Sequence, residues 1–107
     1  MMSTVTITKD NFAQQVEQAA QPVLVDFWAP WCGYCHMLEP ELNAAAEEWA
    51  AQGKAFTIGK VNIDEQPELA DRFEVDGIPL LLLFKNGRPV QSVSGFRPKA
   101  GLLDLLD

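Results

Sequence analysis

The sequence predicts an α/β fold, in which a central mixed sheet is covered by helices on both faces. Strand-like and helix-like segments alternate in the order βαβαβαββα, which is typical of a sheet layered between helices. Residues 23–29, apart from Asp26, and residues 80–84 are continuous apolar runs, as expected of strands covered on both faces. Asn86-Gly87 is a strong signal for a tight hairpin turn. An antiparallel pair of strands therefore completes the sheet.

The first two elements are a short strand and a helix. Val5 and Ile7 alternate with threonines over residues 4–8, which predicts a half-buried strand. Asp10 is placed to cap a helix that ends before Pro22. The apolar positions of this helix recur at helical spacing and are Phe12, Val16 and Ala19/Ala20.

The remaining elements follow from periodicity and turn residues. A long helix is predicted over residues 32–51, with Leu38, Leu42, Ala45/Ala46 and Trp49 on one face. Residues 56–63 indicate a third strand, and residues 64–73 hold a short helix with Pro67 in its first turn. Residues 80–85 and 90–94 pair through the Asn86-Gly87 turn, and a closing helix follows Pro98.

Length and composition favour a single domain over residues 1–107. The 107 residues are 48% hydrophobic and 21% charged, which suits one compact core. The net charge of −7 and the sequence pI of about 4.5 disfavour binding to nucleic acid or to an anionic membrane. The first residues lack the parts of a secretory signal, and no apolar run reaches the roughly 20 residues of a spanning helix. We therefore expect a cytoplasmic protein. We also expect it to be a monomer.

Both cysteines of the chain lie in the stretch Trp31-Cys32-Gly33-Tyr34-Cys35-His36. If the long helix begins at Cys32, the two cysteines are one turn apart, at a separation that a disulfide accepts. Unpaired backbone N–H groups and the helix dipole favour a thiolate at Cys32, and its pKa should lie below the free value of about 8.5. Cys32 is therefore the predicted nucleophile, and Cys35, one turn further in and buried, is the resolving thiol.

Asp26 is the exception in the apolar strand that precedes this stretch. A buried carboxylate is expensive to ionise, so the pKa of Asp26 should be raised, and the side chain could accept the proton of Cys35. The alternative is an Asp26 that faces a solvated edge of the sheet.

Two cofactor interpretations also fit the cysteine spacing. Cys32 to His36 spells the C-x-x-C-H pattern of c-type haem attachment, but haem would need a second axial ligand. Zinc would need a fourth ligand, and adjacent Cys35 and His36 cannot easily face one tetrahedral centre. We therefore expect neither a metal nor a bound cofactor, and His36 is expected to be a solvated helix residue.

Several motifs occur together and in order, and they are Asp26, Trp28-Ala29-Pro30-Trp31-Cys32, Lys60, Asn62-Ile63-Asp64, Gly77-Ile78-Pro79, Phe84-Lys85-Asn86-Gly87 and Gly95. On these motifs, the chain from about Thr4 to its C-terminus resembles the thioredoxins. The resemblance implies strand order 1-3-2-4-5, a cis Ile78–Pro79 bond packed against the cysteines, and reduction of protein disulfides. It also implies that a flavin-dependent thioredoxin reductase, using NADPH, recharges the oxidised form, and that diverse disulfide-containing proteins are clients.

The resemblance also assigns roles by position. Cys32 would attack the client disulfide and Cys35 would resolve the mixed disulfide, with Asp26 buried beneath Cys35 and Lys60 beside Asp26. An extended client segment would pair with the backbone of Ile78. The expected substrate surface comprises Trp31, Gly33, Tyr34, Gly77, Ile78, Pro79, Gly95 and Phe96.

Four residues depart from the family pattern. Tyr34 replaces the usual proline, His36 a lysine, Leu80 a threonine and Phe96 a small residue. The N–H restored at residue 34 and a charged His36 should both favour the Cys32 thiolate, which predicts a more oxidising couple. A disulfide oxidase or isomerase is therefore an alternative to a reductase. A protein-binding holdase, using the Trp31, Ile78, Pro79 and Phe96 surface, is another.

Overall fold

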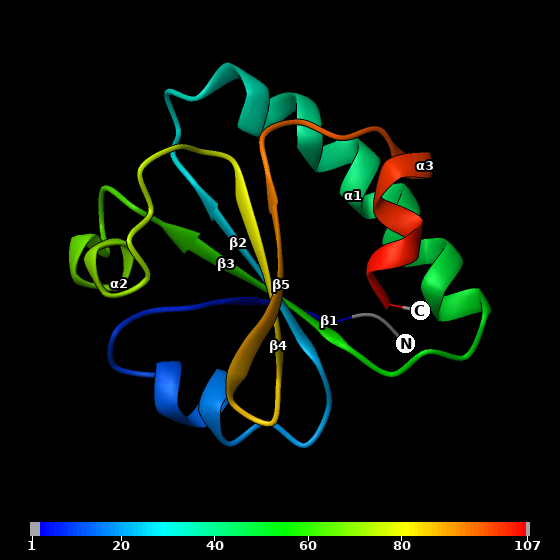
Figure 1. The fold of residues 1–107 in the computed structure, drawn as a ribbon, viewed down its shortest axis with the longest axis horizontal. Helices are drawn as coiled ribbons and strands as arrows, with labels where there is room; N and C mark the ends of the chain where they lie inside the picture. Colours follow the sequence, from blue (N-terminus) through cyan, green and yellow to red (C-terminus); the bar gives the residue numbers. More distant parts are fainter. Residues whose placement is uncertain (1–2, 107) are drawn as a thin grey trace.

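The computed structural model describes residues 3–106 and shows the predicted mixed sheet in the order β1-β3-β2-β4-β5. The three N-terminal strands run parallel, and β4 and β5 are antiparallel to their neighbours. Figure 1 shows helices on both sides of this sheet. The strand order that the resemblance implied is thus confirmed. The strands are β1 (Ser3–Thr6), β2 (Val23–Trp28), β3 (Thr57–Asn62), β4 (Leu80–Lys85) and β5 (Arg88–Ser94).

The helices divide between the two faces of the sheet. The long helix α1 (Gly33–Ala51) and the C-terminal α3 (Lys99–Leu102), which continues as the 3-10 turn η2 (Leu103–Leu106), lie on one side. The π-helical turn η1 (Ala13–Glu17) and α2 (Pro67–Arg72) lie on the other (Figure 1). Two hydrophobic clusters result, and the sheet separates them.

The central strand β2 contributes to both clusters because its successive side chains point to opposite faces. Leu24 packs into the cluster beneath α1, whereas Val25 and Phe27 pack into the cluster beneath η1 and α2. By the same alternation, Asp26 faces α1. Lys60 is the direct partner of Asp26 on β3 and faces the same way. The sheet therefore places these two charged side chains together under α1.

The start of the first helix corrects one prediction. Asp10 is an exposed turn residue and does not cap the helix, whose N-cap is Phe12 without a side-chain hydrogen bond. Thr8 and Asn11 instead bond each other across the turn, each backbone N–H donating to the other's side-chain oxygen, at 2.7 and 3.2 Å. The helix is also shorter than predicted, because it closes at Gln18 as a single π-helical turn.

The predicted hairpin between β4 and β5 is confirmed. Asn86 and Gly87 connect the strands with positive φ angles of 54° and 78°, the backbone of a two-residue hairpin turn. The second strand begins at Arg88, two residues earlier than predicted. Opposite Leu83 and Phe84, a bulge leaves one residue of β5 without a partner on β4. Pro89 is tolerated because β5 is an edge strand.

The β2–α1 connection positions the cysteines. β2 ends at Trp28, and α1 begins after its N-cap, Cys32. The two cysteines therefore lie just beyond the carboxyl end of the central strand, where open α/β sheets place their sites. Across the part of the chain that the structure describes, none of the helices combines the length and the apolar character needed to cross a membrane.

Candidate functional site

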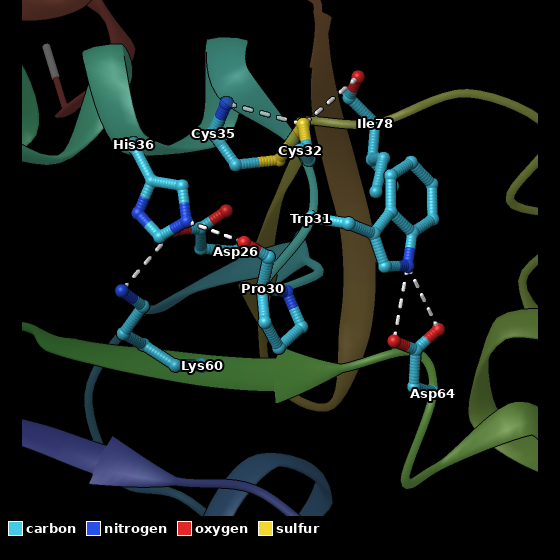
Figure 2. Close-up of a disulfide and its surroundings, with 9 residues drawn as sticks. All are labelled: Asp26, Pro30, Trp31, Cys32, Cys35, His36, Lys60, Asp64 and Ile78. Carbon is cyan, nitrogen blue, oxygen red and sulfur yellow. Dashed lines mark hydrogen bonds and ion pairs between the residues drawn. A yellow bond between two sulfur atoms is a disulfide. The ribbon is translucent and has the colours of Figure 1, made fainter.

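Cys32 and Cys35 form a disulfide at the start of α1 (Figure 2). Their Cα atoms are 5.2 Å apart, within the range that a disulfide accepts. Cys32 is the N-cap with an extended backbone, and the Cys35 N–H donates to Cys32 Sγ over 3.2 Å. A backbone donor of the first helical turn thus points at the Cys32 sulfur, as a thiolate there would require.

Burial does not distinguish the two cysteines. Cys32 is 7% exposed and Cys35 is 6% exposed, and both pack with Ala29 in a small apolar cluster. The sequence predicted burial for Cys35 alone. Both sulfurs are covered because Trp28, Ile63 and Ile78 pack against this cluster. What separates the cysteines is their position at the helix start, since Cys32 accepts the backbone N–H and Cys35 donates it.

Asp26 is a buried carboxylic acid, with 3% of its surface exposed. Burial raises the pKa of Asp26 from 3.8 to about 6, against the opposing attraction of Lys60 and with a smaller contribution from Glu39 in the same direction. Asp26 Oδ2 lies 4.0 Å from Lys60 Nζ, and Asp26 Oδ1 has no hydrogen-bond partner within the described part of the chain. This excludes the alternative of a solvated Asp26 and leaves one carboxyl oxygen able to take a proton.

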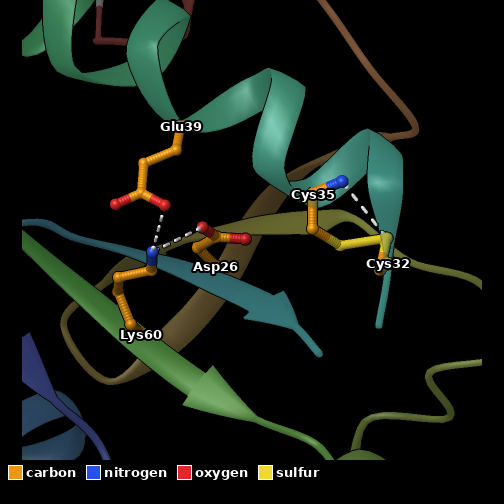
Figure 3. Close-up of polar contacts among 5 residues, drawn as sticks. All are labelled: Asp26, Cys32, Cys35, Glu39 and Lys60. Atoms are coloured by element: carbon orange, nitrogen blue, oxygen red, sulfur yellow. Dashed lines mark hydrogen bonds and ion pairs between the residues drawn. A yellow bond between two sulfur atoms is a disulfide. The ribbon is translucent and has the colours of Figure 1, made fainter. Parts of the chain in front are cut away.

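Lys60 also contacts two other side chains. Its Nζ lies 3.6 Å from Glu39 Oε2 and 4.9 Å from the centre of the Trp28 ring. Figure 3 shows Lys60 reaching up between the Asp26 and Glu39 carboxylates. The family resemblance implied Lys60 beside Asp26, and neither it nor the sequence pattern pointed to Glu39. The available signal was spacing, because Glu39 follows Cys35 by one helical turn.

A shallow apolar groove adjoins the disulfide. It is lined by Trp31, Ile63, Val75, Asp76, Gly77 and Ile78. Trp31 is 68% exposed, and its Nε1–H donates to both carboxylate oxygens of Asp64, at 3.0 and 3.2 Å. Asp64 belongs to the motif Asn62-Ile63-Asp64, which contributed to the family resemblance, but no role was predicted for Asp64 itself. Asp64 therefore holds the exposed Trp31 ring in place at the groove.

The cis bond between Ile78 and Pro79 lies at the edge of this groove. The Ile78 carbonyl oxygen is 3.8 Å from Cys32 Sγ, so the cis-proline segment does pack against the cysteines. The Gly95 N–H donates to the Pro79 carbonyl at 2.9 Å, which brings Gly95 beside the same segment. Cys32, Ile78 and Gly95 thus come from three separate parts of the chain to one edge of the sheet.

The other residues expected at the substrate surface have different settings. Gly33 and Tyr34 form the exposed start of α1, and Tyr34 is 64% exposed. Phe96 is partly buried and packs against the hydrophobic cluster beneath α1 and α3. Phe96 therefore has a packing role, which the sequence did not predict.

His36 lies on the Lys60 side of the disulfide (Figure 2), and the Trp28 ring is near both His36 and Lys60. His36 is exposed, as expected, and its Nε2 forms a 2.7 Å hydrogen bond with the Pro30 carbonyl oxygen, which only an Nε2–H can donate. Trp28, which belongs to the apolar run predicted to be covered on both faces, is only partly buried, and its ring meets the His36 ring edge-on. The Pro30 contact occupies Nε2 of His36. Within residues 3–106, no three His, Cys, Asp or Glu residues are grouped to hold a metal ion.

Comparison with known proteins identifies one family. The family model described as Thioredoxin matches residues 3–107. The chain is 48% identical over 100 residues to the thioredoxin of Alicyclobacillus acidocaldarius subsp. acidocaldarius, covering 94% of this chain and 91% of that protein. It is 45% identical over 106 residues to the thioredoxin of Staphylococcus aureus, covering 99% of this chain and 97% of that protein.

Proposed function

On the premise that the chain belongs to the thioredoxin family and is a dithiol-disulfide oxidoreductase, we propose that it reduces disulfides of cytoplasmic proteins, with Cys32 as nucleophile and Cys35 as resolving thiol. The observation that carries this proposal is the disulfide at the start of α1, with the Cys35 N–H directed at Cys32 Sγ. In the reduced protein the same N–H and the helix N-terminus would stabilise a Cys32 thiolate.

The reaction proceeds in two exchanges. The Cys32 thiolate attacks one sulfur of the client disulfide, a mixed disulfide forms, and the other client sulfur leaves as a thiolate. Cys35 then loses its proton and attacks Cys32 Sγ, which breaks the mixed disulfide and releases the second client thiolate. Two electrons pass from the dithiol to the client, and the protein is left with the Cys32–Cys35 disulfide.

Asp26 is the proposed acceptor of the Cys35 proton. With a pKa of about 6, Asp26 is largely ionised at neutral pH and is still more basic than an ordinary aspartate, which suits a general base. Its Oδ1, for which residues 3–106 offer no hydrogen-bond partner, has capacity for a proton. Lys60, 4.0 Å from Oδ2, keeps the ionised form accessible.

The groove beside the disulfide is the proposed client surface, together with the exposed start of α1 at Gly33 and Tyr34. An extended client segment would hydrogen-bond to the Ile78 backbone, with Gly77, Pro79, Gly95 and Phe96 flanking it. Main-chain pairing gives affinity without reading side chains, so diverse disulfide-containing clients fit this surface. The groove also includes Trp31 and Asp76, and Asp76 would favour client segments that carry positive charge.

The remaining proposals concern the setting of the reaction. Thioredoxins work without a bound cofactor, and we propose that a flavin-dependent thioredoxin reductase, using NADPH, returns the disulfide of this chain to the dithiol. We further propose a monomeric single domain over residues 1–107, acting in the cytoplasm. The net charge of −7 supports partners that are neither nucleic acid nor anionic membrane.

Insulin reduction tests the proposal directly. With NADPH and a bacterial thioredoxin reductase, the parent protein should turn over many insulin molecules. Cys32→Ser should abolish the reaction, and Cys35→Ser should accumulate the Cys32 mixed disulfide, which mass spectrometry detects. Negligible turnover by the parent, with client binding unchanged in the double serine variant, would instead identify a holdase. Net oxidation of reduced clients would identify an oxidase.

A further inference from the structure

One ammonium group is shared between two carboxylates beside the disulfide. Lys60 Nζ lies 3.6 Å from Glu39 Oε2 and 4.0 Å from Asp26 Oδ2. It is therefore closer to Glu39 than to the buried acid. Asp26 receives only part of the electrostatic stabilisation that an undivided ion pair would provide.

The fold produces this sharing through three elements. β2 and β3 present Asp26 and Lys60 as paired neighbours on the sheet face beneath α1. Glu39 comes down from α1, one turn beyond Cys35 (Figure 3). The Asp26 side chain is 5% exposed, that of Lys60 22% and that of Glu39 51%. Glu39 is therefore the most solvent-exposed of the three side chains.

We propose that Glu39 is a positioning residue for disulfide exchange. It shares the Lys60 ammonium with Asp26, and Asp26 therefore stays basic enough to take the proton of Cys35. The inference rests on the proposed function, in which Asp26 is that proton acceptor. Glu39 itself contacts neither the disulfide nor the groove among the contacts described, and it acts through Lys60.

The charges around Asp26 support this role. Lys60 lowers the pKa of Asp26, and the Glu39 carboxylate opposes that effect by raising it. The other titratable groups on this side are His36, which is bonded to the Pro30 carbonyl, and the two cysteines when reduced. The strand on the other side of Asp26 offers an apolar neighbour, Leu81. Since Glu39 is half exposed, salt should weaken its influence.

A titration of Asp26 tests the first half of the proposal. In the oxidised protein, the carboxyl carbon of Asp26 is followed by NMR from pH 3 to pH 9 in the parent, in Glu39→Gln and in Glu47→Gln. Glu47 is an exposed residue of the same helix, so the control removes the same charge without approaching Lys60. The Asp26 midpoint should move to lower pH in Glu39→Gln and stay at the parent value in the control. An unmoved midpoint in Glu39→Gln, or equal shifts in both variants, would overturn the role of Glu39.

The second half is tested by resolving the two exchanges in time. The reduced protein reacts in a stopped-flow instrument with an aromatic disulfide whose thiol product is coloured. The first release of colour reports attack by Cys32, and the second reports attack by Cys35. In Glu39→Gln, the acid limb of the second phase should move to lower pH together with the Asp26 midpoint. A changed midpoint with an unchanged second-phase profile would show that Glu39 does not act on exchange.

Failure of the proposed function has a different signature. A parent protein that does not reduce insulin would overturn the reductase function, and with it any role of Glu39 in exchange. An unmoved Asp26 midpoint in a protein that does reduce insulin would overturn the role of Glu39 alone.

Discussion

At the scale of single residues, Asp26 shows how burial and ion pairing oppose each other. The residue is 3% exposed, and Lys60 Nζ approaches its carboxyl group to 4.0 Å. The pKa nevertheless rises to about 6, so desolvation outweighs the attraction of the ammonium. The Lys60 ammonium lies 4.0 Å away and also pairs with Glu39, so its attraction does not compensate for the burial of the Asp26 carboxylate.

This raised pKa predicts a pH-dependent stability. A rise from 3.8 to about 6 corresponds to about 3 kcal/mol, at roughly 1.36 kcal/mol per pKa unit. Because the folded pKa is the higher one, this stabilisation is complete below pH 3.8 and is lost as the pH rises through 6. The parent should therefore lose about 3 kcal/mol of unfolding free energy between pH 3.5 and pH 7 that the oxidised Asp26→Ala variant does not lose. Urea denaturation of both proteins at the two pH values measures this difference.

The same variant separates stability from chemistry. At pH 7, Asp26→Ala should be more stable than the parent, while the Cys35 step of disulfide exchange should be slower. A variant that is less stable at pH 7 and equally fast in exchange would contradict both assignments.

Some site residues could be predicted from the sequence, and others could not. Cys32 and Cys35 are separated by one turn at a predicted helix start, and Asp26 interrupts an apolar strand, so simple periodicity reveals all three. The burial of Cys32 depends on Ile63 and Ile78, which are distant in sequence. Glu39 sits on an exposed turn of α1, and its approach to Lys60 depends on how the helix lies over the sheet.

At the scale of elements, local signals predicted boundaries well where one signal dominates. The start of α1 and the β4–β5 turn agree with the sequence to within a residue or two, because an N-cap and an Asn-Gly pair each specify a particular backbone. The first helix was less predictable. Asp10, Asn11 and Thr8 can all cap a turn, and the reciprocal bonds between Thr8 and Asn11 form instead.

The β4–β5 turn yields a prediction about Gly87. Its φ is +78°, and a Cβ added there would lie 2.8 Å from the backbone carbonyl oxygen of Glu17. Gly87→Ala should therefore lower the unfolding free energy by more than the roughly 1–2 kcal/mol of left-handed backbone strain. Gly53→Ala is the matched control, because Gly53 has φ +79° with open space around it. Equal losses for the two variants in urea denaturation would show that contact with Glu17 is unimportant.

At the scale of the whole molecule, the sheet divides the core into two clusters and brings the site together at one edge. The alternation along β2 puts Asp26 beneath α1, and the β2–α1 connection puts the cysteines beyond the end of the same strand. The layered α/β class follows from the order of apolar segments. The strand order and the cis Ile78–Pro79 bond came from family resemblance, because long-range pairing leaves little trace in local periodicity.

The central claim is that the start of α1 makes Cys32, and not Cys35, the reactive thiol. The most direct measurement is the rate of alkylation of each thiol in the reduced protein by iodoacetamide from pH 4 to pH 10, with the two modified cysteines quantified separately by mass spectrometry. Cys32 should react first at every pH up to 8, with a midpoint below the ordinary thiol value of about 8.5. Faster alkylation of Cys35, or a Cys32 midpoint at the ordinary value, would contradict the account.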